Sequence, residues 1–425
     1  MILRIESQQT GRGPLPWGIF ILCALCVMLD GFDVQAMGYV APALIQDWRI
    51  PTPALAPVFS AALLGILFGS LFLGALADRI GRRPVLIFGM IYFSAVTIFT
   101  AAAHSLSQLF ALRFLAGLGL GGMMPGAVSL AGEYSPARLR VAVMMLVSAG
   151  FTGGAALGGF ISAWLIPAWG WRSVFLFGGA LPMALAVLMM FLLPESPHFL
   201  SRSLRRNKAR AAELFHDGRT RATLLLWLVN FTNLLNLYFL SSWVPTVARE
   251  AGYSTSTSVL LGAAVQAGGT LGAFGSAWLI ARAGFVRIMS PTFALGAAAV
   301  AAIGQPLLSV PFLFAAVFIA GWSVPGMQPA VNALAGEFYP ADLRSTGIGW
   351  GLGIGRIGAI VGPILGGELI AMKWSPREVF LAAAIPAAIS AVAMLGLRGV
   401  AQPAATRPLS PATTPAPAEP AGRTR

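Results

Sequence analysis

Two aspartates, Asp30 and Asp33, lie in the otherwise apolar stretch CVMLDGFDVQAMGYVAPAL, which spans residues 26–44. Their spacing of three residues places both carboxyl groups on one face of a helix. An ionised carboxylate within a membrane costs about 2.5–3.5 kcal/mol even on the mildest scales, and such residues commonly mark proton relays or substrate paths. The pair therefore predicts a proton-coupling site made by Asp30 and Asp33.

Two arginines, Arg113 and Arg356, lie in other apolar stretches. A guanidinium stays charged at any depth and matches a carboxylate with two parallel hydrogen bonds, so both are candidate anchors for an anionic substrate. At a rise of about 1.5 Å per residue, Asp33 and Arg113 fall in one layer, and Asp30 falls nearer Arg356. The alternative for Asp33 and Arg113 is a permanent ion pair that holds two helices together, but it leaves Asp30 and the second arginine unexplained.

The elements that carry these residues are predicted to be membrane-spanning helices. The chain has 425 residues, of which 57% are hydrophobic and only 10% charged, against about 25% charged in ordinary soluble domains. Apolar runs of about 20 residues suffice to cross a bilayer. We predict an all-α membrane protein with twelve spans, at residues 17–41, 53–77, 84–103, 107–131, 141–166, 171–193, 222–247, 257–281, 288–306, 312–336, 345–370 and 378–397.

The basic residues predict how the chain is oriented. If the N-terminus is inside, 21 of the 28 lysines and arginines lie inside, 5 outside and 2 within helices. Basic loops stay in the cytoplasm, so we expect both termini to be cytoplasmic in a multi-pass protein of the inner (plasma) membrane. The net charge of +13 lies in short loops, which argues against a nucleic-acid partner. The lipid bilayer is the expected partner, and we expect a monomer.

The chain contains an internal repeat at an offset of about 204 residues. Residues 131–140 read AGEYSPARLR and residues 335–344 read AGEFYPADLR, with seven of ten positions identical. Two parallel six-helix halves describe a class of secondary transporter whose substrate site lies between the halves. The predicted parts are an N-terminal half at 1–193, a basic cytoplasmic linker at 194–221, a C-terminal half at 222–400 and a disordered cytoplasmic tail at 401–425.

The repeat pairs Asp30 with Asn233 and Asp33 with Asn236, so the second half carries uncharged copies of the acidic pair. Gln328 and Asn332 could add further hydrogen bonds to a substrate. The candidate substrate-binding residues are therefore Arg113, Arg356, Asn233, Asn236, Gln328 and Asn332.

A turn between the second and third spans reads GALADRIGRR at residues 74–83. Glycines permit a tight turn, and the acid and the arginines can form charge-assisted bonds that break and reform. We interpret this turn and the acid–arginine pairs near residues 133–140 and 337–344 as a gate. The candidate gating residues are Gly74, Asp78, Arg79, Gly81, Arg82, Arg83, Glu133, Arg140, Glu337 and Arg344.

The turn resembles the G-x-L-a-D-r-x-G-r-r signature of the major facilitator superfamily, and Arg113, Gly117 and Gly119 resemble its R-x-x-x-G-x-G pattern. LDGFD, PESPHFL (194–200) and GIGRIGAIVGPILGG (353–367) resemble the aromatic acid:proton symporter family of that superfamily. The resemblance implies uptake of a benzoate-type anion together with a proton by alternating access. It also implies that Asp30 and Asp33 take part in proton-coupled uptake. The family carries the arginines of the fourth and eleventh helices as well, here Arg113 and Arg356. No cofactor is expected.

Other function classes fit the sequence less well. A drug/proton antiporter is favoured by G-x-x-x-G-P-x-x-G-G at 358–367, but that pattern belongs in the fifth helix, where Ala155 replaces the expected proline. A sugar symporter is favoured by PESP but does not need two intramembrane arginines. The gate signature opposes a channel or receptor. The three histidines lie in different loops and the CxxC at 23–26 lies in an apolar helix, so we expect neither an enzyme nor a metal site.

Overall fold

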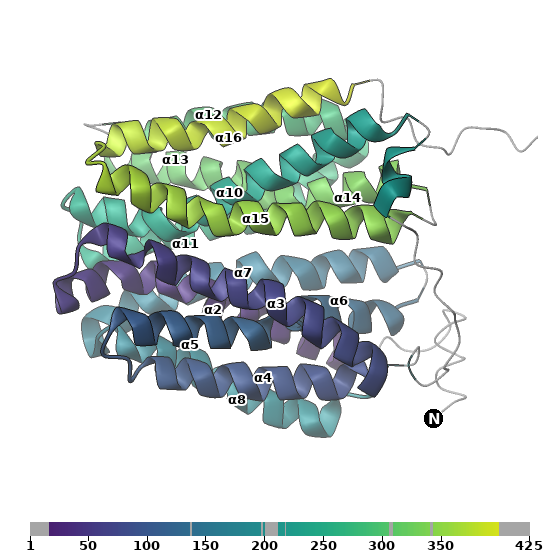
Figure 1. Cartoon of the computed structure of the whole chain (residues 1–425), viewed down its shortest axis with the longest axis horizontal. Coiled ribbons are helices and arrows are strands. Elements are labelled where there is room, and N and C mark those ends of the chain that lie inside the picture. The colour runs from purple at the N-terminus through teal and green to yellow at the C-terminus, as the bar shows by residue number, and fades with distance from the viewer. Residues whose placement is uncertain are drawn as a thin grey trace, which may run out of the picture.

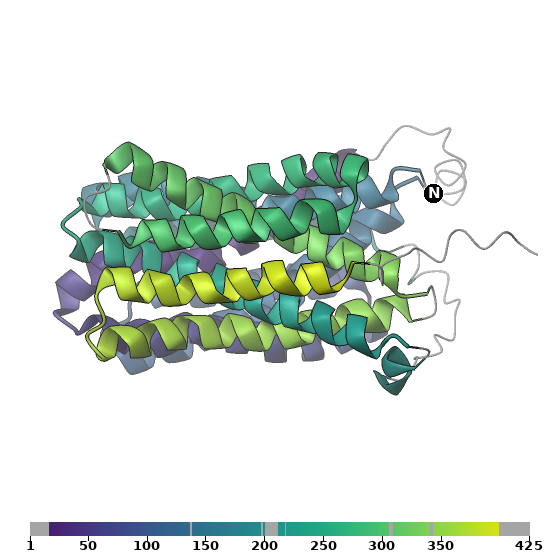
Figure 2. The same cartoon turned by 90° about the horizontal axis from the view of Figure 1, so that it is seen from above.

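The protein is a bundle of long helices in two halves, seen here in a computed structural model (Figures 1 and 2). The structure describes residues 17–136, 138–196, 199, 211–216, 218–305, 309–340 and 343–398. Twelve helical stretches within this part are long and apolar enough to span a membrane, which confirms the predicted fold class. The tail at 401–425 and most of the linker at 194–221 lie outside the described residues.

The first half lies in the lower part of Figure 1 and the second half in the upper part. The first half comprises α2 (Trp17–Trp48), η1 (Thr52–Leu55), α3 (Ala56–Ile80), α4 (Arg82–Thr100), α5 (Leu106–Leu120), α6 (Met123–Glu133), α7 (Arg140–Trp169) and α8 (Arg172–Leu192). After η2 (Ala211–Phe215), the second half comprises α10 (Thr220–Glu250), α11 (Thr255–Ala283), α12 (Phe285–Ile303), α13 (Val310–Ser323), η3 (Pro325–Met327), α14 (Gln328–Phe338), α15 (Arg344–Ala371) and α16 (Pro376–Gly396).

Two features differ from the sequence-based prediction. The first span does not end at residue 41, because α2 continues through Pro42 to Trp48. Proline removes one helical hydrogen bond, and packing of neighbouring helices lets a membrane helix tolerate that loss. The fourth span of each half is a broken helix, interrupted between α5 and α6 and again between α13 and α14. Asp33 therefore lies roughly 22 Å from the end of α2, deeper than the predicted span implied.

The helix ends define two ends of the bundle. We call the end where α2 begins and α16 ends the termini end, on the right of Figure 1, and the opposite end the far end. One buried hydrophobic cluster at the far end combines residues of both halves. Within it, the rings of Phe59 and Trp243 meet edge to face with centroids 5.2 Å apart, and Ser256 donates a hydrogen bond of 3.2 Å to the carbonyl of Ala163 across the two halves. The far end is thus sealed.

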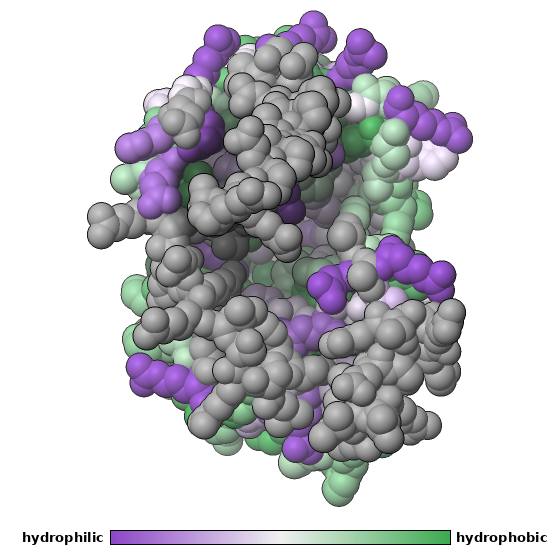
Figure 3. All heavy atoms as spheres, turned by 90° about the vertical axis from the view of Figure 1, so that its right-hand side faces the viewer, coloured by the Kyte–Doolittle hydropathy of each residue, from purple (hydrophilic) through white to green (hydrophobic). Residues whose placement is uncertain are grey.

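At the termini end the two halves are packed separately. The buried residues of one cluster there belong to the first half except for Ala359, with Leu234, Tyr238 and Ile360 of the second half packed against it at its edge. The buried residues of the other cluster all belong to the second half. Figure 3 shows this end hollowed at its centre, between the two halves. The structure is therefore closed at the far end and open toward the termini end.

Glycines set how closely the helices approach. A Cβ on Gly154 of α7 would lie 1.9 Å from the carbonyl oxygen of Met28 on α2. A Cβ on Gly117 of α5 would lie 2.2 Å from the carbonyl oxygen of Ala62 on α3. Small residues at such crossings are typical of membrane helix packing. The superfamily-like glycine pattern of α5 therefore serves helix packing.

We predict that Gly154→Ala sharply lowers the yield of folded protein, because the added methyl group forces α2 and α7 apart where backbone meets backbone. Gly349→Ala is the matched control, since a Cβ there meets nothing within 4 Å. The measurement is the monodisperse peak in detergent size-exclusion chromatography, together with the apparent melting temperature. Equal yields for the two variants would contradict the packing assignment.

Candidate functional site between the halves

A buried ion pair joins α2 to α5. Arg113 donates from Nη1 to Oδ2 of Asp33 and from Nη2 to Oδ1 of Asp33, both at 3.3 Å. Thr97 of α4 donates to Oδ1 of Asp33 at 2.8 Å and accepts from Arg113 at 3.2 Å. The guanidinium carbon lies 5.2 Å from the centroid of the Phe175 ring on α8. The group therefore ties together four helices of the first half.

The surroundings of this ion pair favour a structural role. The Arg113 and Asp33 side chains are 1% and 0% exposed, so each charge has the other as its main source of stabilisation. Asp33 and Arg113 meet as predicted, although α2 extends further beyond Asp33 than the depth estimate assumed. Thr97 was not among the predicted site residues, because a threonine in an apolar helix does not stand out in sequence.

Asp30 lies one turn from Asp33 on α2, toward the termini end. It is only 4% exposed, yet it makes no hydrogen bond or ion pair within 4 Å among the described residues. It interacts electrostatically with Arg356 of α15, as the depth estimate indicated. Tyr238 of α10 interacts electrostatically with both. Asp30, Arg356 and Tyr238 thus form a charged site across the boundary between the halves, and we call it the central site.

Arg356 is half-buried and has no hydrogen-bond acceptor within reach among the described residues. An arginine in a membrane protein is normally paired with a carboxylate or with carbonyl groups. Its fork of N–H donors therefore remains available to a carboxylate that enters between the halves. Tyr238 was not among the predicted site residues, because most membrane aromatics face lipid or the interface.

Amide side chains form a network in the second half. Asn233 donates to Gln328 at 2.7 Å, and Gln328 donates to Asn230 at 3.1 Å and to Asn332 at 3.4 Å. Three predicted substrate-binding residues are thereby brought together, and Asn230 joins them as a residue that the sequence did not single out. The carbonyl oxygen of the Asn233 side chain has no partner, so the network retains an acceptor.

Asn236, the repeat counterpart of Asp33, is 1% exposed, and neither atom of its amide has a partner. The repeat explains why. At an offset of 204 Arg113 corresponds to Val317, and at an offset of 203 Thr97 corresponds to Val300; both valines are fully buried. Valine cannot hydrogen-bond to an amide, so the second half lacks the charged cluster of the first.

The predicted gate of the first half is connected by hydrogen bonds at the termini end. Arg82 forms an ion pair with Glu133, which also accepts from Ser196. The backbone N–H groups of Arg82 and Arg83 donate to Glu195 at 2.9 and 3.1 Å, so this carboxylate caps the start of α4. Glu195 was not a predicted gating residue, although it lies in the PESP stretch.

Gly81 is required by the same arrangement. Its φ of +102° is unfavourable for other residues, and a Cβ would lie 2.4 Å from the Glu195 carboxylate.

Burial and the nearby Glu195 raise the pKa of Tyr134, whose hydroxyl donates to the Glu195 carbonyl at 2.7 Å. The tyrosine therefore remains protonated and a donor at neutral pH.

The other predicted gating residues are less connected. Arg140 donates to the carbonyl of Gly132 at 3.1 Å. A Cβ added to Gly74 would have no atom within 4 Å, so no close contact there requires a glycine. Arg79, Glu337 and Arg344 are exposed, and no side-chain hydrogen bond or ion pair joins them to the described residues. The side chain of Asp78 lies outside the described part. The described residues contain no group of three His, Cys, Asp or Glu side chains placed to hold a metal ion.

Known proteins are similar to this chain over most of its length. The family model of the Major Facilitator Superfamily matches residues 23–311 and 226–424. The 4-hydroxybenzoate transporter PcaK of Pseudomonas aeruginosa is 40% identical over 418 residues, which cover 91% of this chain and 93% of that protein. The gallate transporter of Pseudomonas putida is 38% identical over 424 residues, covering 92% and 94%. A crystal structure of a D-xylose-proton symporter superposes with a TM-score of 0.72 at 15% identity, covering 90% and 97%.

We predict that Arg113→Leu destabilises the protein by about 3–5 kcal/mol, because it leaves the buried Asp33 carboxylate without its partner. The double variant Asp33→Asn/Arg113→Leu removes both charges and should recover part of the loss. Arg172→Leu is the matched control, because its ion pair with Asp47 is about half exposed and such pairs contribute about 0–1 kcal/mol. The readout is the apparent melting temperature in detergent. A double variant no more stable than Arg113→Leu would contradict a structural ion pair.

Proposed function

The chain belongs to the Major Facilitator Superfamily, and from that premise we propose that it imports a small aromatic carboxylate together with a proton. Membership confirms the superfamily resemblance of the 74–83 turn. The similar proteins reported above are transporters, so the chain is a transport protein of the membrane and not an enzyme. Benzoate and hydroxybenzoate are the substrates that we propose.

The observation that carries the proposal is that the buried Asp30 of the first half interacts electrostatically with Arg356 of the second, while neither side chain has a direct partner among the described residues. Arg356 would bind the substrate carboxylate with two parallel hydrogen bonds. Tyr238 and the acceptor on Asn233 would lie beside the ring and could bind hydroxyl groups on it. The names of the relatives, 4-hydroxybenzoate transporter and gallate transporter, support aromatic acids with hydroxyl substituents.

Charge balance supports proton coupling through Asp30. With Asp30 ionised and Arg356 charged, the central site is neutral before the substrate enters. An entering anion adds a negative charge in surroundings of low polarity, where an unbalanced charge is costly. A proton on the Asp30 carboxyl group restores neutrality, because Arg356 then balances the substrate. We therefore assign the coupled proton to Asp30, with Asp33 held by Arg113 as a positioning residue.

Alternating access would follow from the two ends of the bundle. We propose that the termini end faces the cytoplasm, in line with the distribution of basic residues. The structure would then release substrate inward while the cluster around Phe59 and Trp243 seals the outside. The contacts among Arg82, Glu133 and Glu195 would break and re-form as the halves rock. Arg113 would remain paired with Asp33, so Arg356 rather than Arg113 would bind the substrate.

The proposal is tested by uptake of radiolabelled benzoate and 4-hydroxybenzoate into cells that express the chain. We expect accumulation above the external concentration, abolished by a protonophore. One proton per anion makes transport electroneutral, so accumulation should follow the pH gradient at about tenfold per pH unit. Absence of accumulation, or accumulation that ignores the protonophore, would overturn proton-coupled import.

We also predict that Asp30→Asn abolishes accumulation while exchange of labelled for unlabelled substrate continues, because a permanently neutral side chain preserves the balance with bound anion. Arg356→Gln should abolish both, because it removes the anchor. Asp47→Asn is the matched control on the same helix, since Asp47 is 48% exposed. Accumulation by Asp30→Asn at the level of Asp47→Asn would remove Asp30 from the coupling mechanism.

A further inference from the structure

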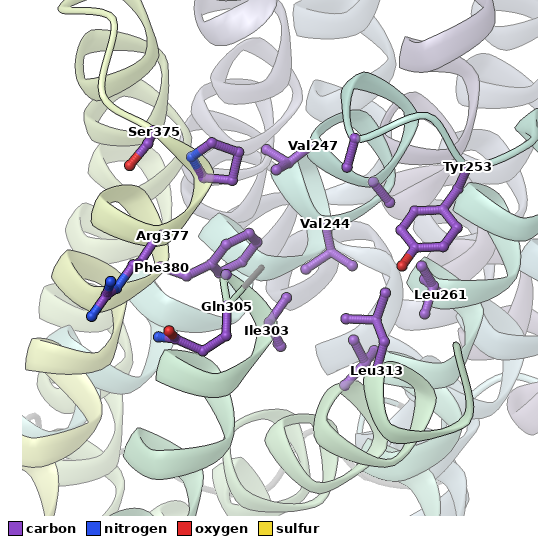
Figure 4. A pocket seen from close by; sticks show the side chains of 15 residues that line it. Val244, Val247, Tyr253, Leu261, Ile303, Gln305, Leu313, Ser375, Arg377 and Phe380 are labelled. Atoms are coloured by element: carbon purple, nitrogen blue, oxygen red, sulfur yellow. The ribbon is translucent and has the colours of Figure 1, made fainter. Parts of the chain in front are cut away.

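A cavity of about 490 Å³ lies inside the second half, near the far end (Figure 4). Its lining residues come from α10, α11, α12, α13, α16 and the turns between them, and none comes from the first half. It is therefore separate from the central site, to which α2 contributes. Most of its wall is apolar, including Val244, Leu261, Leu313 and Phe380.

The repeat explains why this cavity exists. In the first half, Trp48 and Trp171 pack edge to face with centroids 5.7 Å apart, and the Trp171 indole donates to Asp47 at 2.9 Å. Their counterparts at offsets of 203 and 204 are Ala251 and Ser375, and both line the cavity. Two indole rings are thus replaced by a methyl and a hydroxymethyl group.

The offset is fixed independently on both sides of the cavity. Pro42 corresponds to Pro245 on α10, at an offset of 203, and Pro182 corresponds to Pro386 on α16, at an offset of 204. Val317, which replaces the bulkier Arg113, also lines the cavity. The space that side chains fill in the first half is therefore open in the second.

Polar side chains gather on one side of the cavity. In Figure 4, Ser375, Arg377 and Gln305 lie on that side, and Tyr253 lies on the opposite side. Arg377 is exposed and makes no side-chain hydrogen bond or ion pair within 4 Å among the described residues. The neighbouring Glu378 carboxylate interacts with Arg377 electrostatically, but it accepts from the N–H and hydroxyl of Ser375 at 2.7 and 2.8 Å as a helix cap. The cavity thus has a largely apolar interior with one cation, Arg377, at its edge.

We propose that this cavity is a second binding site, for a small carboxylate with an apolar body. The body would lie among Val244, Leu313 and Phe380, and the carboxylate would face Arg377. The volume lies within the range of roughly 300–1,000 Å³ that is typical of ligand sites, and apolar cavities bind small aromatic molecules. The ligand could be the transported acid or an aliphatic acid of similar size, and only the choice of benzoate as a probe rests on the proposed function.

The test is equilibrium dialysis of the full-length protein in phosphatidylcholine nanodiscs against radiolabelled benzoate, with radiolabelled hexanoate as a separate arm. We expect two benzoate sites per chain. Ala248→Phe and Val317→Phe should each fill the cavity and leave one site, without loss of melting temperature. Arg377→Gln should weaken that site about tenfold, as loss of a charged hydrogen-bond partner does. Lys373→Gln is the matched control, an exposed cation at the same end that does not line the cavity.

Measurements on the Arg356→Gln variant distinguish binding in the cavity from binding at the central site. In that variant, one benzoate site should remain, and adding Ala248→Phe should remove it, even if the proposed transport function is wrong. Binding of hexanoate that Ala248→Phe abolishes would support the cavity as a site for aliphatic acids. The inference is overturned if folded Ala248→Phe and Val317→Phe bind both ligands with the stoichiometry of the unmodified chain.

Discussion

A charge buried among membrane helices must be neutralised, and this constraint organises the first half of the protein. Asp33 and Arg113 satisfy it directly, with Thr97 as a shared hydrogen-bond partner. Because the pair joins α2 to α4 and α5 beneath the Phe175 ring, it fixes how α2 is rotated. The same rotation places Asp30, one turn away, at the boundary between the halves. A structural ion pair thus presents a second carboxylate that has no direct partner of its own.

The duplication gives the two halves one fold with different polar contents. The first half contains the ion pair, the connected gate and the packed tryptophans, whereas the second contains the amide network, Arg356 and the cavity. Asn236 without a partner and the space left by Ala251 and Ser375 are costs of this divergence, since unpaired amides and voids both lower stability. We propose that this divergence gives each half a separate role, in which the first half binds the coupled proton and the second half binds the anion.

Sequence reasoning found much of this arrangement for physical reasons. Membrane helices must be long and apolar, so twelve spans could be recognised, and a charge in such a helix stands out, which singled out Asp30, Asp33, Arg113 and Arg356. The repeat identified the asparagine copies. The neutral partners Thr97 and Asn230 could not be found in this way, because their importance depends on which helices face each other, and Tyr238 did not stand out from the other aromatic residues. The end of the first span was predicted too early, because α2 continues through Pro42 to Trp48.

The role of Asp30 as carrier of the coupled proton is tested most directly in proteoliposomes that contain a pH-sensitive dye. Adding 4-hydroxybenzoate outside, without an imposed gradient, should acidify the lumen in step with substrate entry for the unmodified protein and for Asp47→Asn. Asp30→Asn should exchange substrate without any substrate-driven acidification. If Asp30→Asn acidifies the lumen as fast as Asp47→Asn, the coupled proton is carried elsewhere and the account of the central site is wrong.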